Sequence, residues 1–69
     1  MSNAFSSAHI ISVLLKHGFI EVSQKGSHRK YRYKTYTVIV PHPRKDIPFG
    51  TFNSIVRQSG LKKADFLDG

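Results

Sequence analysis

Residues 19–41 read FIEVSQKGSHRKYRYKTYTVIVP, and the predicted fold is built around the strands of this segment. Side chains that favour strands, β-branched and aromatic, recur along it, and Gly26 interrupts it once. The pattern predicts three strands, over residues 19–25, 27–34 and 35–40. Pro41 ends the third strand because proline has no backbone N–H to donate to a ladder. Strands joined by turns this short pair antiparallel, so we expect an antiparallel sheet.

The second predicted strand alternates between two sets of side chains. Tyr31 and Tyr33 share one phase with Arg29, and the two tyrosines identify that phase as the inward face. The opposite phase consists of His28, Lys30 and Arg32. We therefore expect these three side chains together on the open face of the sheet, where a substrate can reach them.

The third predicted strand carries apolar side chains in both phases. Ile39 alternates with Val38 and Val40, so we expect this strand to be covered on both faces, as a central strand is. Tyr36 lies near its start and has no predicted side. Tyrosines interleaved with basic residues also suit stacking on unpaired bases, although alternation favours the core for the two tyrosines of the second strand.

Amphipathic helices flank the predicted sheet in the sequence. The first is expected at residues 7–17, with Ser6 or Ser7 as its N-cap and Gly18 as the left-handed residue that ends it. Its apolar stripe consists of Ile11, Leu14 and Leu15. Lys16 and His17, near its C-terminus, complement the helix dipole.

A second helix is predicted to begin between residues 48 and 51 and to end at Gly60. The residues at helical spacing within it are Phe52, Ile55, Val56 and Ser59. Residues 61–67 are expected to add one more turn that packs back through Leu61 and Phe66. The resulting α-β-β-β-α order predicts an α+β domain, in which two helices cover one face of a three-stranded antiparallel sheet.

Length and composition bound the class of protein. Sixty-nine residues suffice for one domain, placed at residues 6–69, and residues 1–5 are expected to be disordered or left from an expression vector. The chain has no cysteine, which excludes disulfides and thiolate metal sites. No apolar run approaches the ~20 residues of a membrane helix. We therefore expect a soluble cytoplasmic protein with no membrane partner.

The charge is strongly one-sided. Eleven Lys and Arg against four Asp and Glu give a formal net charge of +7. Residues 22–45 contain seven basic residues, two histidines and no acid. Such a block inside a foldable sequence is typical of a protein that binds a polyanion. A solvated basic surface or an acidic protein partner explains the same block, so charge alone does not select nucleic acid.

Within this block, residues 24–31 read QKGSHRKY and set His28 just after a glycine bend, among cations. Histidine exchanges a proton near neutral pH, and neighbouring cations stabilise negative charge as it builds on a phosphodiester. This pairing favours RNA cleavage over simple RNA binding. The plainer interpretation is an exposed histidine on a basic strand, or a cap of the Gly26 turn.

The other histidines carry weaker signals. His9 and His17 are expected at the surface of the first helix, and His42, held between two prolines, either shapes its loop or carries a second proton. No set of His, Asp and Glu shows metal-ligand spacing, so we expect neither a metal nor another cofactor. The sequence contains no phosphate-binding glycine loop and no serine-nucleophile motif.

Short motifs stand in order along the chain. They are Gly18-Phe19, Gln24-Lys25-Gly26-Ser27-His28, Val38-Ile39-Val40-Pro41-His42, Lys45-Asp46-Ile47-Pro48, Gly50-Thr51 and Ser54-Ile55-Val56-Arg57-Gln58-Ser59-Gly60-Leu61. Together, over residues 6–66, they resemble the HicA/YcfA-like toxins of bacterial and archaeal type II toxin–antitoxin systems.

The resemblance implies a fold like that of a double-stranded-RNA-binding domain, an mRNA interferase activity and inhibition by a HicB-type antitoxin. It places the functional histidine of the family at His28. The residues expected to bind RNA are Lys25, Gly26, Ser27, Arg29, Lys30 and Arg32. Arg29 stands where a second histidine is frequent. Phe49 and Asn53 stand where basic residues are common, which weakens the case for RNA binding by the second helix.

Two functions follow from these expectations. The first is a metal-independent endoribonuclease, in which His28 takes the proton of the RNA 2′-hydroxyl. Lys25, Arg29 or Lys30 then stabilises the transition state. The second is a module that binds structured RNA without cutting it. A part in a transcriptional repressor, reaching operator DNA only through the antitoxin complex, is held as a secondary role.

Overall fold

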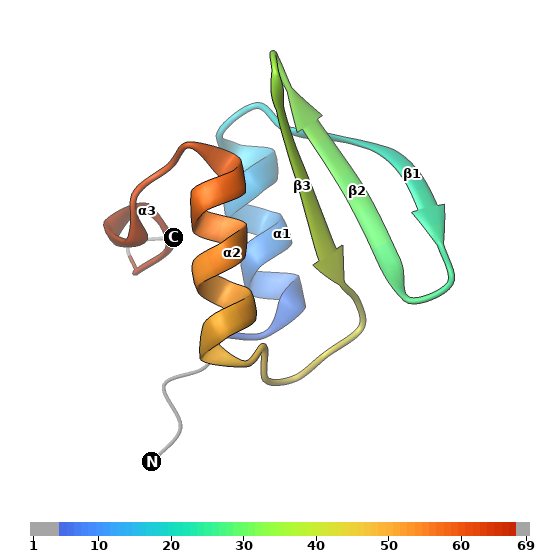
Figure 1. The fold of residues 1–69 in the computed structure, drawn as a ribbon, viewed down its shortest axis with the longest axis vertical. Helices are drawn as coiled ribbons and strands as arrows, with labels where there is room; N and C mark the ends of the chain where they lie inside the picture. Colours follow the sequence, from blue (N-terminus) through green and yellow to red (C-terminus); the bar gives the residue numbers. More distant parts are fainter. Residues whose placement is uncertain (1–4, 68–69) are drawn as a thin grey trace.

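A layer of helices packs against one face of a sheet in this computed structural model, which describes residues 5–67 (Figure 1). Its elements are α1 (Ser7–Lys16), β1 (Ile20–Lys25), β2 (His28–Tyr33), β3 (Tyr36–Pro41), α2 (Phe49–Ser59) and α3 (Lys63–Leu67). The strands pair antiparallel in the order β1-β2-β3. The predicted α+β architecture is confirmed, and its arrangement resembles that of a double-stranded-RNA-binding domain.

The ends of α1 follow from local side-chain chemistry. Ser6 is the N-cap, because its hydroxyl oxygen accepts the His9 N–H at 3.1 Å. Beyond the C-terminus, Gly18 adopts a φ of 96°, which glycine takes at no steric cost. The buried residues of the helix are Ser7, Ile10, Val13 and Leu14. The predicted apolar stripe is wrong at Leu15, which is 52% exposed. The side of the helix that faces the core runs through residues 10, 13 and 14, so Leu15 lies beyond it.

The central strand is β2, not β3. Three strands joined in succession by tight turns place the middle one at the centre. β3 is therefore an edge strand, and the expectation that both of its faces are covered is wrong: Ile39, on the open face, is 36% exposed. Its backbone N–H donates to Gln58 Oε1 of α2 at 3.1 Å. This contact satisfies a backbone group that an edge strand otherwise leaves free.

The register of β1 on β2 shifts between Glu21 and Ser23, which is the mark of a β-bulge. The paired residues are Glu21 with Tyr31, Ser23 with Lys30, Gln24 with Arg29 and Lys25 with His28. Cross-strand partners lie on the same face of a sheet. Glu21 therefore lies on the helix side and Lys25 on the open side, although residues four apart in a regular strand share one face.

Two tyrosines anchor the hairpin of β2 and β3 to the helices. Tyr33 and Tyr36 are cross-strand partners at its end. A Cβ on Gly18 would lie 2.8 Å from the Tyr33 ring, and a Cβ on Gly60 would lie 2.5 Å from the Tyr36 ring. Each ring thus packs on the glycine that ends a helix. Tyr36, which had no predicted side, lies on the helix side of the sheet.

The core lies between the helices and the β2–β3 half of the sheet. Its buried residues are Ile10, Val13, Leu14, Phe19, Tyr31, Val38, Val40, Ile47, Phe52, Ile55 and Phe66. Leu61 packs against them, so the predicted packing of the last turn is confirmed at both of its residues. Phe5 packs there too, with its ring 5.0 Å from that of Phe52. The rest of the predicted N-terminal segment, residues 1–4, lies outside the described residues.

Candidate functional site

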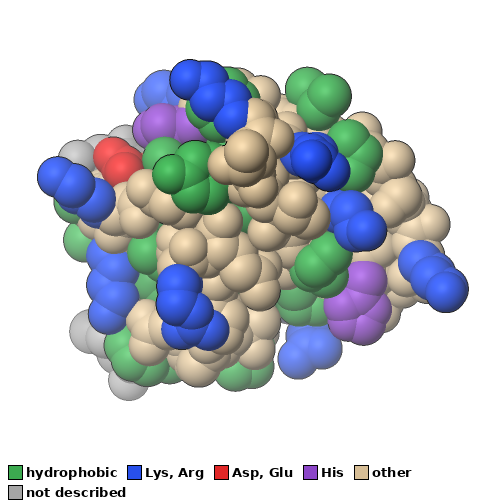
Figure 2. Space-filling view, turned by 45° about the horizontal axis from the view of Figure 1, so that its top comes forward, with side chains coloured by type: hydrophobic (Ala, Val, Ile, Leu, Met, Phe, Trp, Pro, Cys, Tyr) green, Lys and Arg blue, Asp and Glu red, His purple; other side chains and the backbone are tan. Residues whose placement is uncertain are grey.

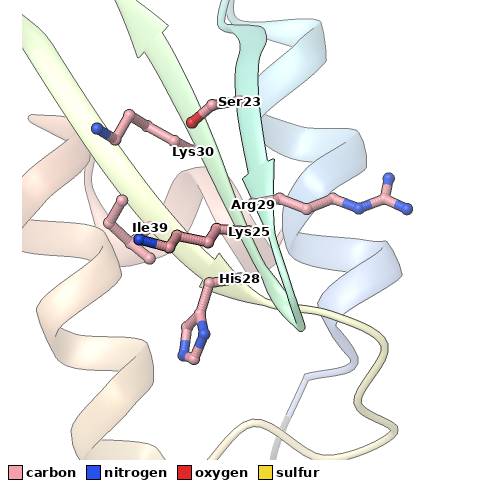
Figure 3. Close-up of a pocket in the computed structure, with 6 residues that line it drawn as sticks. All are labelled: Ser23, Lys25, His28, Arg29, Lys30 and Ile39. Carbon is pink, nitrogen blue, oxygen red and sulfur yellow. The ribbon is translucent and has the colours of Figure 1, made fainter.

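His28 begins β2 directly after the β1–β2 turn, and its side chain is exposed on the open face. Its cross-strand partners are Lys25 on β1 and Pro41 on β3. Directly opposed residues of antiparallel strands hold their Cβ atoms about 4.5–5.5 Å apart. The Lys25 ammonium is therefore within reach of a group bound at the imidazole. Figure 3 shows both side chains on the same side of the hairpin.

The next rung of the open face carries a second ammonium group. Lys30 pairs with Ser23 on one side and with Ile39 on the other. The two rungs surround a shallow hollow of about 590 Å³, lined by Ser23, Lys25, His28, Arg29, Lys30 and Ile39. The hollow thus combines an imidazole and two ammonium groups with an apolar wall.

Arg29 is the predicted site residue whose charged end lies elsewhere. Its guanidinium extends to the opposite side of β2 from Lys25 and Lys30 (Figure 3). There Arg29 Nη1 donates to Glu21 Oε1 at 3.3 Å, and the Tyr31 hydroxyl donates to the same oxygen at 3.2 Å. Burial raises the pKa of Tyr31 above its ordinary value of 10.0, and the Glu21 carboxylate adds to the rise. The Arg29 guanidinium is therefore engaged on the helix side, away from the imidazole.

The turn before His28 is open to solvent. Gly26 has a φ of 59°, and nothing lies within 4 Å of the position that a Cβ would take. Ser27 is exposed as well. A bound phosphodiester can therefore approach the backbone of the turn without displacing a side chain.

Charge on the open face is of one sign. Arg32 occupies a third rung, and its Nε donates to the Lys34 carbonyl oxygen at 3.3 Å. The carboxylates of the described residues lie elsewhere: Glu21 faces the helices, Asp46 precedes α2, and Asp65 accepts the Lys62 N–H beside α3. Figure 2 shows Lys and Arg side chains around a histidine, with apolar side chains between them, on the side where the sheet lies. Such a face attracts anions.

A scan against models of known protein families matches residues 7–61 to the HicA toxin of bacterial toxin–antitoxin systems. The chain belongs to the HicA toxin family. The match runs from the start of α1 to just beyond α2, so it contains the whole open face. This HicA family member is thus the toxin of a toxin–antitoxin system, and an antitoxin partner is implied. A search of curated proteins found no match.

Of the two roles left open for His42 in this HicA family member, the structure favours the shaping of its loop. Ser7 Oγ lies 2.7 Å from His42 Nδ1 and accepts the Arg44 N–H at 2.9 Å. Ser7 is 1% exposed and belongs to the first turn of α1, so it joins the loop after β3 to the helix layer. The His42 ring therefore faces the helices and not the hollow. Sequence reasoning considered Ser7 only as a helix cap and missed this contact, which no local pattern marks.

His9 departs from its predicted surface position. Its ring stacks on Phe5 with centroids 4.8 Å apart, and its Nε2 donates to the Phe66 carbonyl oxygen at 2.6 Å. His17 Nδ1 donates to the Val13 carbonyl oxygen at 2.9 Å. The imidazoles of His9, in α1, and of His17, its C-cap residue, thus bond within the helix layer, and neither lines the hollow.

Within residues 5–67, no group of three or more His, Cys, Asp or Glu side chains is placed to hold a metal ion. In that part no helix has the length and apolar character needed to cross a membrane.

Proposed function

We propose that this HicA family member is an mRNA interferase, an endoribonuclease that cleaves mRNA without a metal ion and uses His28 as its general base. The observation that carries the proposal is the first rung of the open face, where an exposed imidazole stands directly opposite Lys25. A base beside a cation suits phosphodiester cleavage, because the proton acceptor and the stabiliser of the developing charge act on neighbouring atoms.

RNA supplies its own nucleophile in this reaction. A ring nitrogen of neutral His28 takes the proton of the 2′-hydroxyl, and the 2′-oxygen attacks the adjacent phosphorus. The bond from phosphorus to the 5′-oxygen breaks, which leaves a 2′,3′-cyclic phosphate and a 5′-hydroxyl. Lys25 and Lys30 stabilise the extra negative charge of the transition state. The leaving oxygen takes its proton from water, from a lysine or from the imidazolium itself.

The same geometry limits the substrate to RNA. DNA carries the same phosphates and is attracted to the same cations, but it lacks the 2′-hydroxyl that the mechanism consumes. DNA oligonucleotides therefore bind without being cut. Arg29 has no part in this mechanism, because its guanidinium bonds Glu21 on the other side of the sheet.

The implied antitoxin partner fits the same face. A HicB-type antitoxin that covers the open face with acidic side chains would neutralise Lys25, Lys30 and Arg32. The same contact would bury the His28 imidazole. In that complex the toxin reaches operator DNA only through the antitoxin.

The variant His28→Ala tests the proposal. In EDTA, its rate of RNA cleavage should fall by roughly 10²–10⁴-fold while its RNA affinity is retained. His17→Ala is the matched control, since it removes an imidazole at the C-cap of α1 that bonds the Val13 carbonyl oxygen of that helix, and it should cleave as the wild type does. If wild-type protein at micromolar concentration binds RNA and leaves it intact, the nuclease proposal is wrong. The alternative, a non-catalytic RNA-binding module, then holds.

A further inference from the structure

The open face of β2 presents an imidazole and two cations at a regular interval. His28, Lys30 and Arg32 are separated by two residues each and alternate with inward side chains. A strand rises about 3.3–3.4 Å per residue, so neighbouring rungs are about 6.7 Å apart. That interval is comparable to one extended nucleotide, whose phosphate recurs after six backbone bonds.

The cations form a single line. The partners of Lys30 and Arg32 on the flanking strands are uncharged: Ser23, Ile39, Ile20 and Thr37. Ile20 is 62% exposed, so apolar surface borders the line where riboses and bases would lie. A single line of charge matches a single phosphate backbone, whereas a duplex presents two backbones across a groove.

The first rung differs from the other two, because it joins the His28 imidazole to the ammonium group of Lys25. Lys25 stands opposite His28, and no second basic residue pairs with Lys30 or Arg32. The line therefore has a reactive end, at the β1–β2 turn, and a binding end, toward the β2–β3 hairpin.

From this placement we infer that the substrate is single-stranded RNA laid along β2. The scissile phosphate sits at the rung of Lys25 and His28, and the next two phosphates on one side of it sit at Lys30 and Arg32. The inference rests on the proposed function and adds to it a substrate class and a register. Arg32 holds the strand at a point away from the reacting phosphate, and Lys30 holds the phosphate next to the reacting one while its charge also acts on the transition state.

Affinity measurements on the His28→Ala variant test the register independently of cleavage. Single-stranded RNA oligonucleotides with one neutral methylphosphonate linkage, moved one position at a time, report which phosphates are held. We expect the affinity to fall when the neutral linkage occupies any one of three consecutive positions. In the double variant His28→Ala/Arg32→Gln, the loss at the terminal one of the three should disappear, because its cation is gone.

Salt dependence gives a second readout. For single strands the slope of log affinity against log salt changes by about 0.7 for each phosphate contact, so Arg32→Gln should lower its magnitude by about that amount. Arg57→Gln, which removes a guanidinium from α2, should leave the slope unchanged. Three results would overturn the inference. They are losses of affinity spread evenly along the oligonucleotide, a linkage scan that Arg32→Gln leaves unchanged, and a duplex bound as tightly as the single strand. Register-specific binding without cleavage by the wild type would overturn the nuclease alone.

Discussion

The Tyr36 ring packs directly on Gly60, the residue that ends α2. Gly60 has a φ of 72°, and a Cβ added to it would lie 2.5 Å from Tyr36 Cε1. A side chain at this position therefore meets two obstacles, a left-handed backbone and an aromatic ring. The contact joins the end of the β2–β3 hairpin to the helix layer. The core lies between that hairpin and the helices, so its packing depends on this contact.

Three glycine-to-alanine variants separate these two obstacles. Gly60→Ala should lower the free energy of unfolding by more than 2 kcal/mol, since the left-handed backbone alone costs about 1–2 kcal/mol. Gly26→Ala meets only the backbone obstacle and should cost about 1–2 kcal/mol. Gly50→Ala meets neither, lies in α2, and should stabilise by up to about 1 kcal/mol. Urea denaturation measures all three, and equal losses for the first two would contradict the role of the ring.

The contact of Ser7 with the loop after β3 makes a second prediction. Ser7→Ala should cost about 1–3 kcal/mol, because the Arg44 N–H and His42 Nδ1 lose a buried partner. Ser12→Ala is the control on the same helix: its exposed hydroxyl bonds only the His9 carbonyl oxygen, and its loss should stay within about 0.5 kcal/mol. Thermal unfolding of the two variants gives the comparison, and equal midpoints would argue against the loop anchor.

The raised pKa of Tyr31 predicts how stability depends on pH. Burial is the main cause, the Glu21 carboxylate adds to it, and the Arg29 guanidinium opposes it. The folded protein thus keeps the phenol proton to a higher pH than the unfolded chain does. The free energy of unfolding should therefore fall as pH rises above 10.0 and through the folded pKa.

Tyr31→Phe supplies the control for this prediction. The variant loses one hydrogen bond, so its free energy of unfolding at neutral pH should be about 1 kcal/mol lower. Above pH 10.0 its stability should decline less steeply than that of the wild type. Urea titrations at several alkaline pH values measure both slopes. Parallel slopes for the two proteins would show that another group governs the alkaline loss.

Lys25 and Arg29 offer a matched test of the two faces of the hairpin. Both lie within two residues of the turn, both are cationic, and only Lys25 stands on the face of His28. Lys25→Gln should lower kcat/KM for RNA cleavage by roughly tenfold or more relative to Arg29→Gln, because it removes charge beside the reacting phosphate. A larger loss in Arg29→Gln would place the reaction on the other face of the sheet.

Several features followed from the sequence because their causes are local. The alternation of His28, Lys30 and Arg32 against Tyr31 is a property of any extended strand, whatever lies beside it. Gly60 ends its helix because a left-handed residue is needed there. The resemblance to the HicA family likewise rested on short motifs in order along residues 6–66, and the family match over residues 7–61 contains most of that range.

Other predictions failed where a residue's surroundings are set by distant parts of the chain. Leu15 looked as apolar as Ile10, and only the position of the sheet decides which side of α1 is buried. The sequence placed His9 at the surface, but its ring bonds the carbonyl oxygen of Phe66, which comes from the other end of the chain.

The elements, the inward face of β2 and the open-face set of His28, Lys30 and Arg32 follow from the sequence alone, because alternation along a strand is local. The place of Lys25 beside His28 and the pairing of Arg29 with Glu21 depend on how β1 pairs with β2. The bulge between Glu21 and Ser23 reverses the phase of β1, so Lys25 joins the imidazole on the open face. Alternation along β2 leaves Arg29 on the helix side, where Glu21 holds it. The physical reason is that pairing between strands sets their register, and one inserted residue turns every later side chain to the opposite face.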